Sequence, residues 1–161
     1  MDDIVLDTNV LMHASDPRER LCPLARALVR SIKDSETKIC VDEGFNLNPA
    51  QNRSLIGQEY STHLKHGSYA AAFILALSNG KRIRVVSRNV QRKTKKMILQ
   101  RVRKPRDRTF LYVTVNSTEN VLVSHDFEDF TQDKREGLRR DLLIHIVTAQ
   151  EALPRFQAFP E

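Results

Sequence analysis

The stretch Ile4-Val5-Leu6-Asp7-Thr8-Asn9 is the starting point for interpreting the chain. Three consecutive aliphatic residues are typical of a strand buried on both faces, as in a parallel α/β sheet. Asp7 would then follow the carboxyl end of that strand, where open α/β sheets bind their ligands. Alternatively, Asp7 only caps the helix that follows. Thr8 and Asn9 either take part in capping or support the Asp7 carboxylate.

The composition indicates a single globular domain over residues 1–161, with 40% hydrophobic and 29% charged residues. No apolar run reaches the length of a membrane span, and we expect no membrane association and no signal or transit peptide. Cys22 and Cys40 stand alone, which predicts reduced, buried thiols in a cytoplasmic protein, although a bridge between them stays open. A net charge of +6 favours a polyanionic partner.

Hydrophobic periodicity predicts strands that alternate with helices. Strands are expected at 4–6, 38–41, 83–86, 121–123 and 142–147. Helices are expected at 8–13, 20–34, 53–64, 69–77, 107–115 and 134–140, with a helical tail at 150–156. Such alternation predicts an α/β fold, a doubly wound three-layer α/β/α arrangement with a central parallel sheet.

Four acids are expected to converge at one edge of this sheet, and a fifth follows one of them closely in sequence. Asp7 and Asp126 each follow a strand, and the carboxyl ends of parallel strands share an edge. Glu59 and Asp107 lie on inward helix faces, and Asp129 lies in the turn after Asp126. Each has a structural alternative: Asp107 complements a helix dipole, Glu59 is solvated, and Asp126 and Asp129 form a turn.

Clustered carboxylates repel one another, so a protein retains them when protons or cations compensate their charge. Oxygen ligands without a His or Cys set favour Mg²⁺ or Mn²⁺. Two such ions can activate water and stabilise the leaving oxygen during attack on a phosphodiester. His63 and His66 lack a third soft ligand, so we do not expect zinc.

The segment 88–108 carries ten Lys or Arg residues and a single acid, Asp107. Such a surface can hold a nucleic-acid backbone through charge without reading sequence. The alternative is a solubilising surface. The candidate nucleic-acid-binding residues are Arg92, Lys93, Lys95, Lys96, Arg101, Arg103, Lys104 and Arg106.

Four stretches together resemble the motifs of the PIN-domain family. The first is 7–11, and the second is 39–64, which contains Glu59. The third is 106–113, and the fourth is 122–130. Each lies at the expected end of a strand or helix, and the resemblance covers nearly the whole chain.

The resemblance implies a single PIN-like nuclease domain, a Mg²⁺- or Mn²⁺-dependent endoribonuclease. It implies an RNA substrate, single-stranded or structured, and leaves an antitoxin-type protein partner and a homodimer open. The implied catalytic and metal-binding residues are Asp7, Glu59, Asp107 and Asp126, with Asp129 as auxiliary ligand and Thr8, Asn9 and Ser124 as supporting groups.

Two departures from the family pattern leave alternatives. The loop before Glu59 is long, so Asp42 or Glu43 could replace Glu59. Two residues separate Asp126 from Asp129, which leaves open which of the two is the primary ligand. Alternative functions are a non-catalytic nucleic-acid-binding PIN-like module, or a toxin component held by a protein partner. A phosphoacceptor domain is less favoured, because it needs an acidic pair after the first strand and a late Lys.

Overall fold

A parallel sheet of five strands forms the centre of the computed structural model, which describes residues 1–157. The strand order is β3-β2-β1-β4-β5, and every neighbouring pair is parallel. The strands are β1 (Asp3–Leu6), β2 (Lys38–Asp42), β3 (Ile83–Val86), β4 (Val121–Val123) and β5 (His145–Val147). Residues 158–161 of the predicted domain lie outside the described part of the chain.

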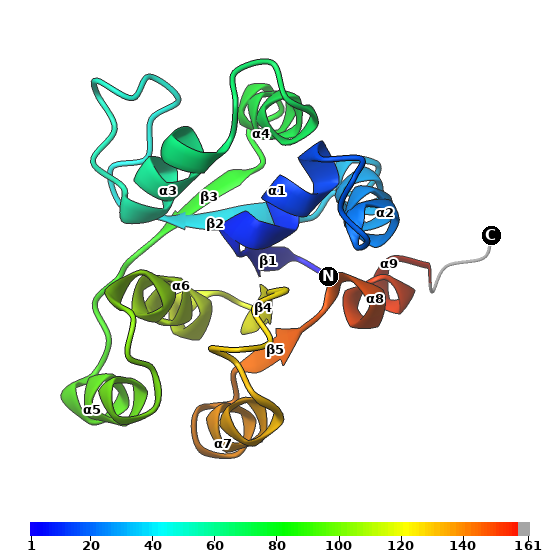
Figure 1. Cartoon of the computed structure of the whole chain (residues 1–161). Helices are drawn as coiled ribbons and strands as arrows, with labels where there is room; N and C mark the ends of the chain where they lie inside the picture. Colours follow the sequence, from blue (N-terminus) through cyan, green and yellow to red (C-terminus); the bar gives the residue numbers. More distant parts are fainter. Residues whose placement is uncertain (158–161) are drawn as a thin grey trace.

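Helices cover both faces of the sheet (Figure 1). One side carries α1 (Thr8–Ser15), α2 (Cys22–Lys33) and α4 (Tyr69–Asn79). The other side carries α5 (Arg92–Arg101), α6 (Pro105–Asn116) and α7 (Gln132–Leu142). The remaining helices are α3 (Leu55–His63), α8 (Ala149–Ala152) and α9 (Pro154–Gln157). The predicted three-layer α/β/α fold class is therefore confirmed.

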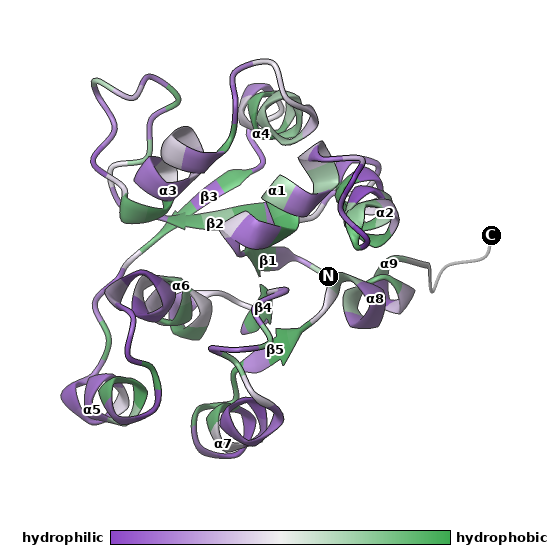
Figure 2. Cartoon of the chain, in the orientation of Figure 1, coloured by the Kyte–Doolittle hydropathy of each residue, from purple (hydrophilic) through white to green (hydrophobic). Residues whose placement is uncertain are grey.

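The opening strand lies in the middle of the core. Ile4, Val5 and Leu6 have no exposed surface, as expected for a strand covered on both faces. Figure 2 shows apolar colour along the central strands and polar colour over the outer turns of α5 and α7. Cys22 and Cys40 are buried free thiols within this core.

The sheet changes direction between β1 and β4. From β1 the chain adds β2 and β3 on one side, then returns to place β4 on the other side of β1. Val5 pairs with Leu122 and Leu6 with Val123, so the two strands end together. Open α/β sheets bind ligands at such a switch point. The residues that follow these two strands, Asp7 and Ser124, are therefore placed side by side.

Several predicted boundaries needed correction. The last strand was predicted over 142–147 but starts at His145, because α7 continues to Leu142. Leu143 then adopts a left-handed conformation with φ 58°, which ends the helix and turns the chain into β5. The helix predicted at 134–140 is correspondingly longer.

The other corrections concern helix starts and the tail. The helix predicted from 53 begins at Leu55, because the Ser54 hydroxyl caps it by accepting from the Gly57 N–H. The helix predicted from 20 begins at Cys22. The predicted tail helix consists of two short helices, α8 and α9. Within the described residues, no helix is both long enough and apolar enough to span a membrane.

Candidate metal centre

Asp7 does not cap the helix that follows it. The residue occupies the N-cap position of α1, but its side chain accepts no hydrogen bond from the helix backbone. Instead, Asp7 Oδ2 accepts from Ser124 Oγ at 2.7 Å and from Asn9 Nδ2 at 3.2 Å. The carboxylate is therefore oriented by Ser124 and Asn9, and Asn9 has the supporting role that the sequence left open as an alternative to capping.

The same supporting residues fix the loop after β4. Ser124 Oγ accepts from the Asp126 N–H at 3.1 Å, and Asn9 Oδ1 accepts from the His125 N–H at 3.0 Å. Asn9 and Ser124 thus tie the ends of β1 and β4 together around Asp7. Thr8 behaves differently, because its buried hydroxyl has no hydrogen-bond partner among the described residues.

Three acids form a tight group at this edge. Asp107, Asp126 and Asp129 each contribute a carboxylate oxygen, and these oxygens lie within 4.8 Å of one another. Asp107 comes from the first turn of α6, whereas Asp126 and Asp129 come from the loop after β4. Asp126 Oδ1 also accepts from the Asp129 N–H at 2.8 Å, so the predicted turn-forming role holds as well. Asp126 and Asp129 thus form a turn and also belong to the acid group.

Within this group, Asp107 combines burial with a missing hydrogen-bond donor. Its side chain is 2% exposed, and its Oδ2 has no hydrogen-bond partner among the described residues. Burial, followed by the negative charge of Asp7, raises the pKa of Asp107 to about 6, and Asp126 and Asp129 add to this effect. Burial also raises the pKa of Asp7, although the hydrogen bonds from Ser124 and Asn9 oppose it.

Glu59 lies at the rim of the group and not within it. Arg106 connects the two, because its Nη1 lies 3.6 Å from Glu59 Oε2 and its Nε lies 3.5 Å from Asp107 Oδ1. His63 Nε2 is 3.5 Å from the same Glu59 oxygen. That oxygen is buried and accepts no hydrogen bond. Glu59 therefore joins the acids through a shared cation.

Lys104 makes a second cationic contact. Its ammonium group pairs with Asp129 Oδ2, and this pairing lowers the pKa of the Asp129 carboxyl. The sequence predicted Lys104 and Arg106 as nucleic-acid contacts and missed that both face the acids. Their position within three residues of Asp107 is the signal that could have indicated it.

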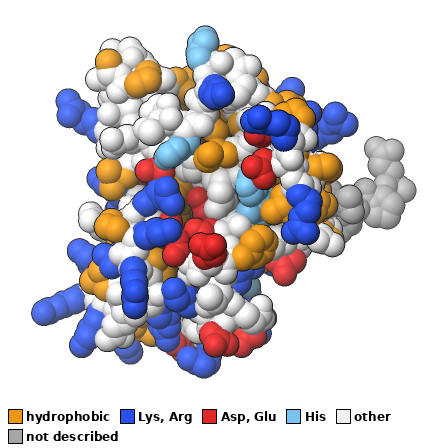
Figure 3. All heavy atoms as spheres, in the orientation of Figure 1, with side chains coloured by type: hydrophobic (Ala, Val, Ile, Leu, Met, Phe, Trp, Pro, Cys, Tyr) orange, Lys and Arg blue, Asp and Glu red, His pale blue; other side chains and the backbone are white. Residues whose placement is uncertain are grey.

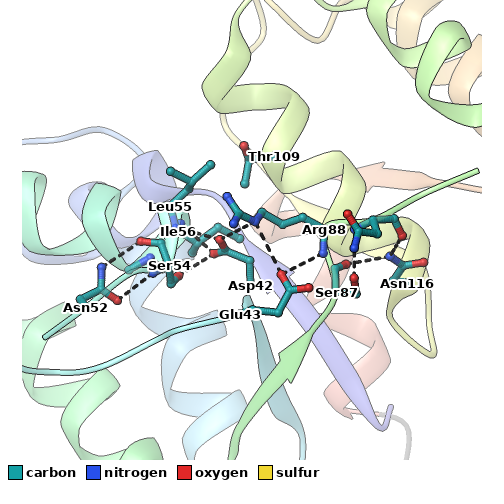
Figure 4. Close-up of polar contacts among 12 residues, drawn as sticks. Asp42, Glu43, Asn52, Ser54, Leu55, Ile56, Ser87, Arg88, Thr109 and Asn116 are labelled. Carbon is teal, nitrogen blue, oxygen red and sulfur yellow. Dashed lines mark hydrogen bonds and ion pairs between the residues drawn. The ribbon is translucent and has the colours of Figure 1, made fainter. Parts of the chain in front are cut away.

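Asp42 and Glu43, the alternatives to Glu59, make other contacts and do not belong to the group of three acids found among the described residues. Asp42 is fully buried and accepts from Ser54 Oγ at 2.5 Å, from the Leu55 N–H at 2.8 Å and from the Ile56 N–H at 2.9 Å. Arg88 Nε lies 3.3 Å from Asp42 Oδ2 (Figure 4). Asp42 therefore holds the N-terminus of α3. Glu43 accepts from the Arg88 N–H.

Tyr60 anchors α3 at a second point. Its buried hydroxyl donates to the Leu6 carbonyl at 2.6 Å, which belongs to the peptide group that joins Leu6 to Asp7. Together with Asp42, this bond fixes α3 against β1 and β2. The helix that carries Glu59 is thus held firmly beside the acids.

His125 belongs to the supporting structure. Its Nε2 accepts from the Ala149 N–H at 3.2 Å, so Nδ1 carries the proton and lies 2.8 Å from Nδ1 of His13. Burial, followed by the neighbouring His13 and Arg135 side chains, lowers the pKa of His125 to about 4. A neutral ring with both nitrogens occupied is a structural group, consistent with its omission from the predicted catalytic set.

The predicted basic surface runs along α5 and into the start of α6. Among the described residues, no carboxylate lies within ion-pair distance of the exposed Arg92, Lys93, Lys95, Lys96 or Arg103. Figure 3 shows cationic side chains over this part of the molecule, beside the acidic side chains near its centre.

Arg101 differs from its neighbours on this surface. It pairs with Asp141 of α7 and so helps to hold α5 and α7 together. It is also less exposed than the other predicted cations of α5.

The donor set fits a hard divalent cation. Among the described residues, the potential ligands that converge here are all carboxylates, and one of the three residues, Asp107, has a buried Oδ2 without a donor. Comparison of the chain with protein-family models, with curated proteins and with solved structures found no match.

Proposed function

We propose that the chain is a PIN-like, metal-dependent endoribonuclease. One observation carries the proposal: Asp107, which has a buried carboxylate oxygen without a hydrogen-bond partner among the described residues, belongs to a group with Asp126 and Asp129. Buried polar atoms in folded proteins are nearly always hydrogen-bonded, and buried like charges repel. A bound cation accounts for both departures at once.

In this proposal Asp107, Asp126 and Asp129 hold Mg²⁺ or Mn²⁺, and Asp7 and Glu59 complete the negative surroundings. The metal supplies a Lewis acid that promotes attack of water on the phosphodiester and stabilises the leaving oxygen. Ser124 and Asn9 keep the Asp7 carboxylate aligned. The expected products carry 5′-phosphate and 3′-hydroxyl ends.

The substrate is positioned by charge. The exposed cations of α5 and Arg103 have no carboxylate partner within ion-pair distance among the described residues. Figure 3 shows cationic side chains beside acidic side chains on one face of the molecule. Contacts of this kind neutralise phosphates without reading bases. We therefore expect cleavage of single-stranded or structured RNA with modest sequence preference.

The first prediction concerns Asp7→Asn. The substitution retains shape but removes a negative charge next to the metal ligands, so Mn²⁺-dependent cleavage should fall by roughly 10²–10³-fold. The measurement is the rate of cutting of an end-labelled RNA, alongside a DNA of the same sequence and an EDTA control. Asp34→Asn, a change at an exposed acid outside the cluster, serves as the matched control.

Circular dichroism and thermal unfolding establish that the Asp7→Asn variant is folded. If that variant cuts RNA as fast as the parent protein, the site assignment is wrong. Cutting that persists in EDTA would also contradict a metal-dependent reaction.

A second candidate function is a non-catalytic nucleic-acid-binding module. The unpaired cations of α5 favour it, because they lie outside the acid group and can bind a phosphate backbone without it. It predicts salt-sensitive RNA binding with no cleavage in Mn²⁺. The same labelled RNA, analysed for both binding and cutting, distinguishes the two functions.

A further inference from the structure

Two cations from one short segment contact the acids directly. Lys104, just before α6, pairs with Asp129, and Arg106, in its first turn, lies between Asp107 and Glu59. They are close neighbours in sequence, and they join the basic surface of α5 to the acid group. We refer to Lys104 and Arg106 as the counter-ion pair.

The counter-ion pair and a metal ion have overlapping partners. Asp107 and Asp129 both belong to the group of oxygens within 4.8 Å, and they are also the acids that Arg106 and Lys104 contact. A divalent cation bound there would repel both side chains. Asp107 and Asp129 therefore cannot keep their full ion pairs with Arg106 and Lys104 while they also bind a metal ion.

The counter-ion pair is free to leave. The side chains of Lys104 and Arg106 are 53% and 42% exposed, so their ion pairs are partly screened by water. Exposed ion pairs contribute little stability, and a Lys ammonium on its flexible stem can reorient easily.

We propose that Lys104 and Arg106 are exchangeable counter-ions that couple metal binding to nucleic-acid binding. Without metal they neutralise the acids; when metal binds they are released and contact phosphates of the nucleic acid. The inference rests on the proposed function, of which it names the regulation. Because coupling between two binding equilibria is reciprocal, nucleic acid must strengthen metal binding by the same factor.

The first test measures Mn²⁺ binding alone, from the electron paramagnetic resonance signal of free Mn²⁺. Removing a competing charge should tighten binding, so Lys104→Gln and Arg106→Gln should each raise Mn²⁺ affinity about three- to tenfold. Lys96→Gln, which removes an exposed charge outside the acid group, should change it less than about twofold. Unchanged affinity in both counter-ion variants would overturn the inference.

The second test measures the coupling. Fluorescence anisotropy follows a phosphorothioate oligoribonucleotide, checked afterwards on a denaturing gel for intactness, with Mn²⁺ or with EDTA. Mn²⁺ should strengthen binding to the parent protein about fivefold and to the Lys104→Gln, Arg106→Gln double variant less than about twofold. Lys96→Gln should bind more weakly overall yet keep the full Mn²⁺ effect.

The outcomes separate this inference from the proposed function. If RNA is cut with Mn²⁺ but the double variant keeps the coupling, the inference fails and the nuclease stands. If coupling is lost in the double variant but no RNA is cut by the parent, the inference stands and the nuclease fails. If the parent protein binds no Mn²⁺, both fail.

Discussion

Asp42 and Asp107 are both buried carboxylates, yet their surroundings are opposite. Asp42 accepts from one hydroxyl and two backbone N–H groups and also contacts Arg88. Asp107 keeps one oxygen without any donor among the described residues and faces two other acids. Burial alone therefore does not indicate a functional acid. In the proposed function, Asp107 is distinguished by burial without a donor beside other acids.

Asp3 supports the same distinction. It is fully buried and accepts from the Thr118 and Glu119 N–H groups at 3.0 Å each, and it pairs with Arg84. These hydrogen bonds outweigh burial and lower the pKa of the Asp3 carboxyl. Like Asp42, it is a structural acid that ties separate segments together.

The largest effect on stability is expected when Asp42, the buried acid with a full set of donors, is removed. Asp42→Ala would leave the Leu55 and Ile56 N–H groups and Arg88 without their partner, so we expect a loss of about 3–5 kcal/mol in the free energy of unfolding. Urea denaturation measures it. Asp34→Ala, at an exposed acid, should change stability by less than about 0.5 kcal/mol. Equal values for the two variants would refute the structural role.

Replacing Asp107, the buried acid without a full set of donors, should instead raise the free energy of unfolding. The raised pKa of Asp107, from 3.8 to about 6, means that folding disfavours its charged form by about 3 kcal/mol at neutral pH. In EDTA at pH 7, Asp107→Asn should therefore be more stable than the parent by about 1–3 kcal/mol. Denaturation curves at several pH values measure this difference.

The pH dependence follows from the same shift. The penalty is fully present above the folded pKa near 6, declines as the pH falls through it, and vanishes below the unfolded value of 3.8. The advantage of Asp107→Asn should thus disappear near pH 4. Added Mn²⁺ should stabilise the parent more than the variant. If Asp107→Asn is less stable than the parent protein at pH 7 in EDTA, the charged form of Asp107 does not destabilise the fold and the interpretation is wrong.

The smallest effect on stability is expected on α5, away from both acids. Changing Lys93, Lys95 and Lys96 together to Gln should alter the free energy of unfolding by less than about 0.5 kcal/mol. RNA binding should weaken, and the slope of log affinity against log salt should fall by about 0.7 for each single-strand phosphate that the variant no longer neutralises. Anisotropy titrations at several salt concentrations measure the slope. An unchanged slope would assign these lysines to solubility.

The fold class and the position of Asp7 could be predicted from the sequence because both follow from short-range patterns. Apolar runs identified the strands, and parallel strands must end at one edge, which brought Asp7 near Ser124 and Asp126. The termination of α7 at Leu143 was missed. A left-handed residue that is not glycine carries no clear sequence signal.

The functions of individual charges could not be predicted in the same way. Asp42 has the sequence context of a strand-end ligand, but Ser54 and the first turn of α3, twelve or more residues later, satisfy it. Arg106 lies in a basic run that suggests an outward direction, yet it turns toward Glu59 and Asp107. Such outcomes depend on which side chains the tertiary fold brings together.

The strand order has a consequence for when the acid group can form during synthesis. Asp7 and Ser124 are 117 positions apart and meet only because β4 inserts beside β1 late in the chain. A nascent polypeptide still on the ribosome would lack the complete acid group until the chain had emerged beyond Asp129. A chain that ends before β4 would lack Ser124, Asp126 and Asp129 and could not assemble the acid group.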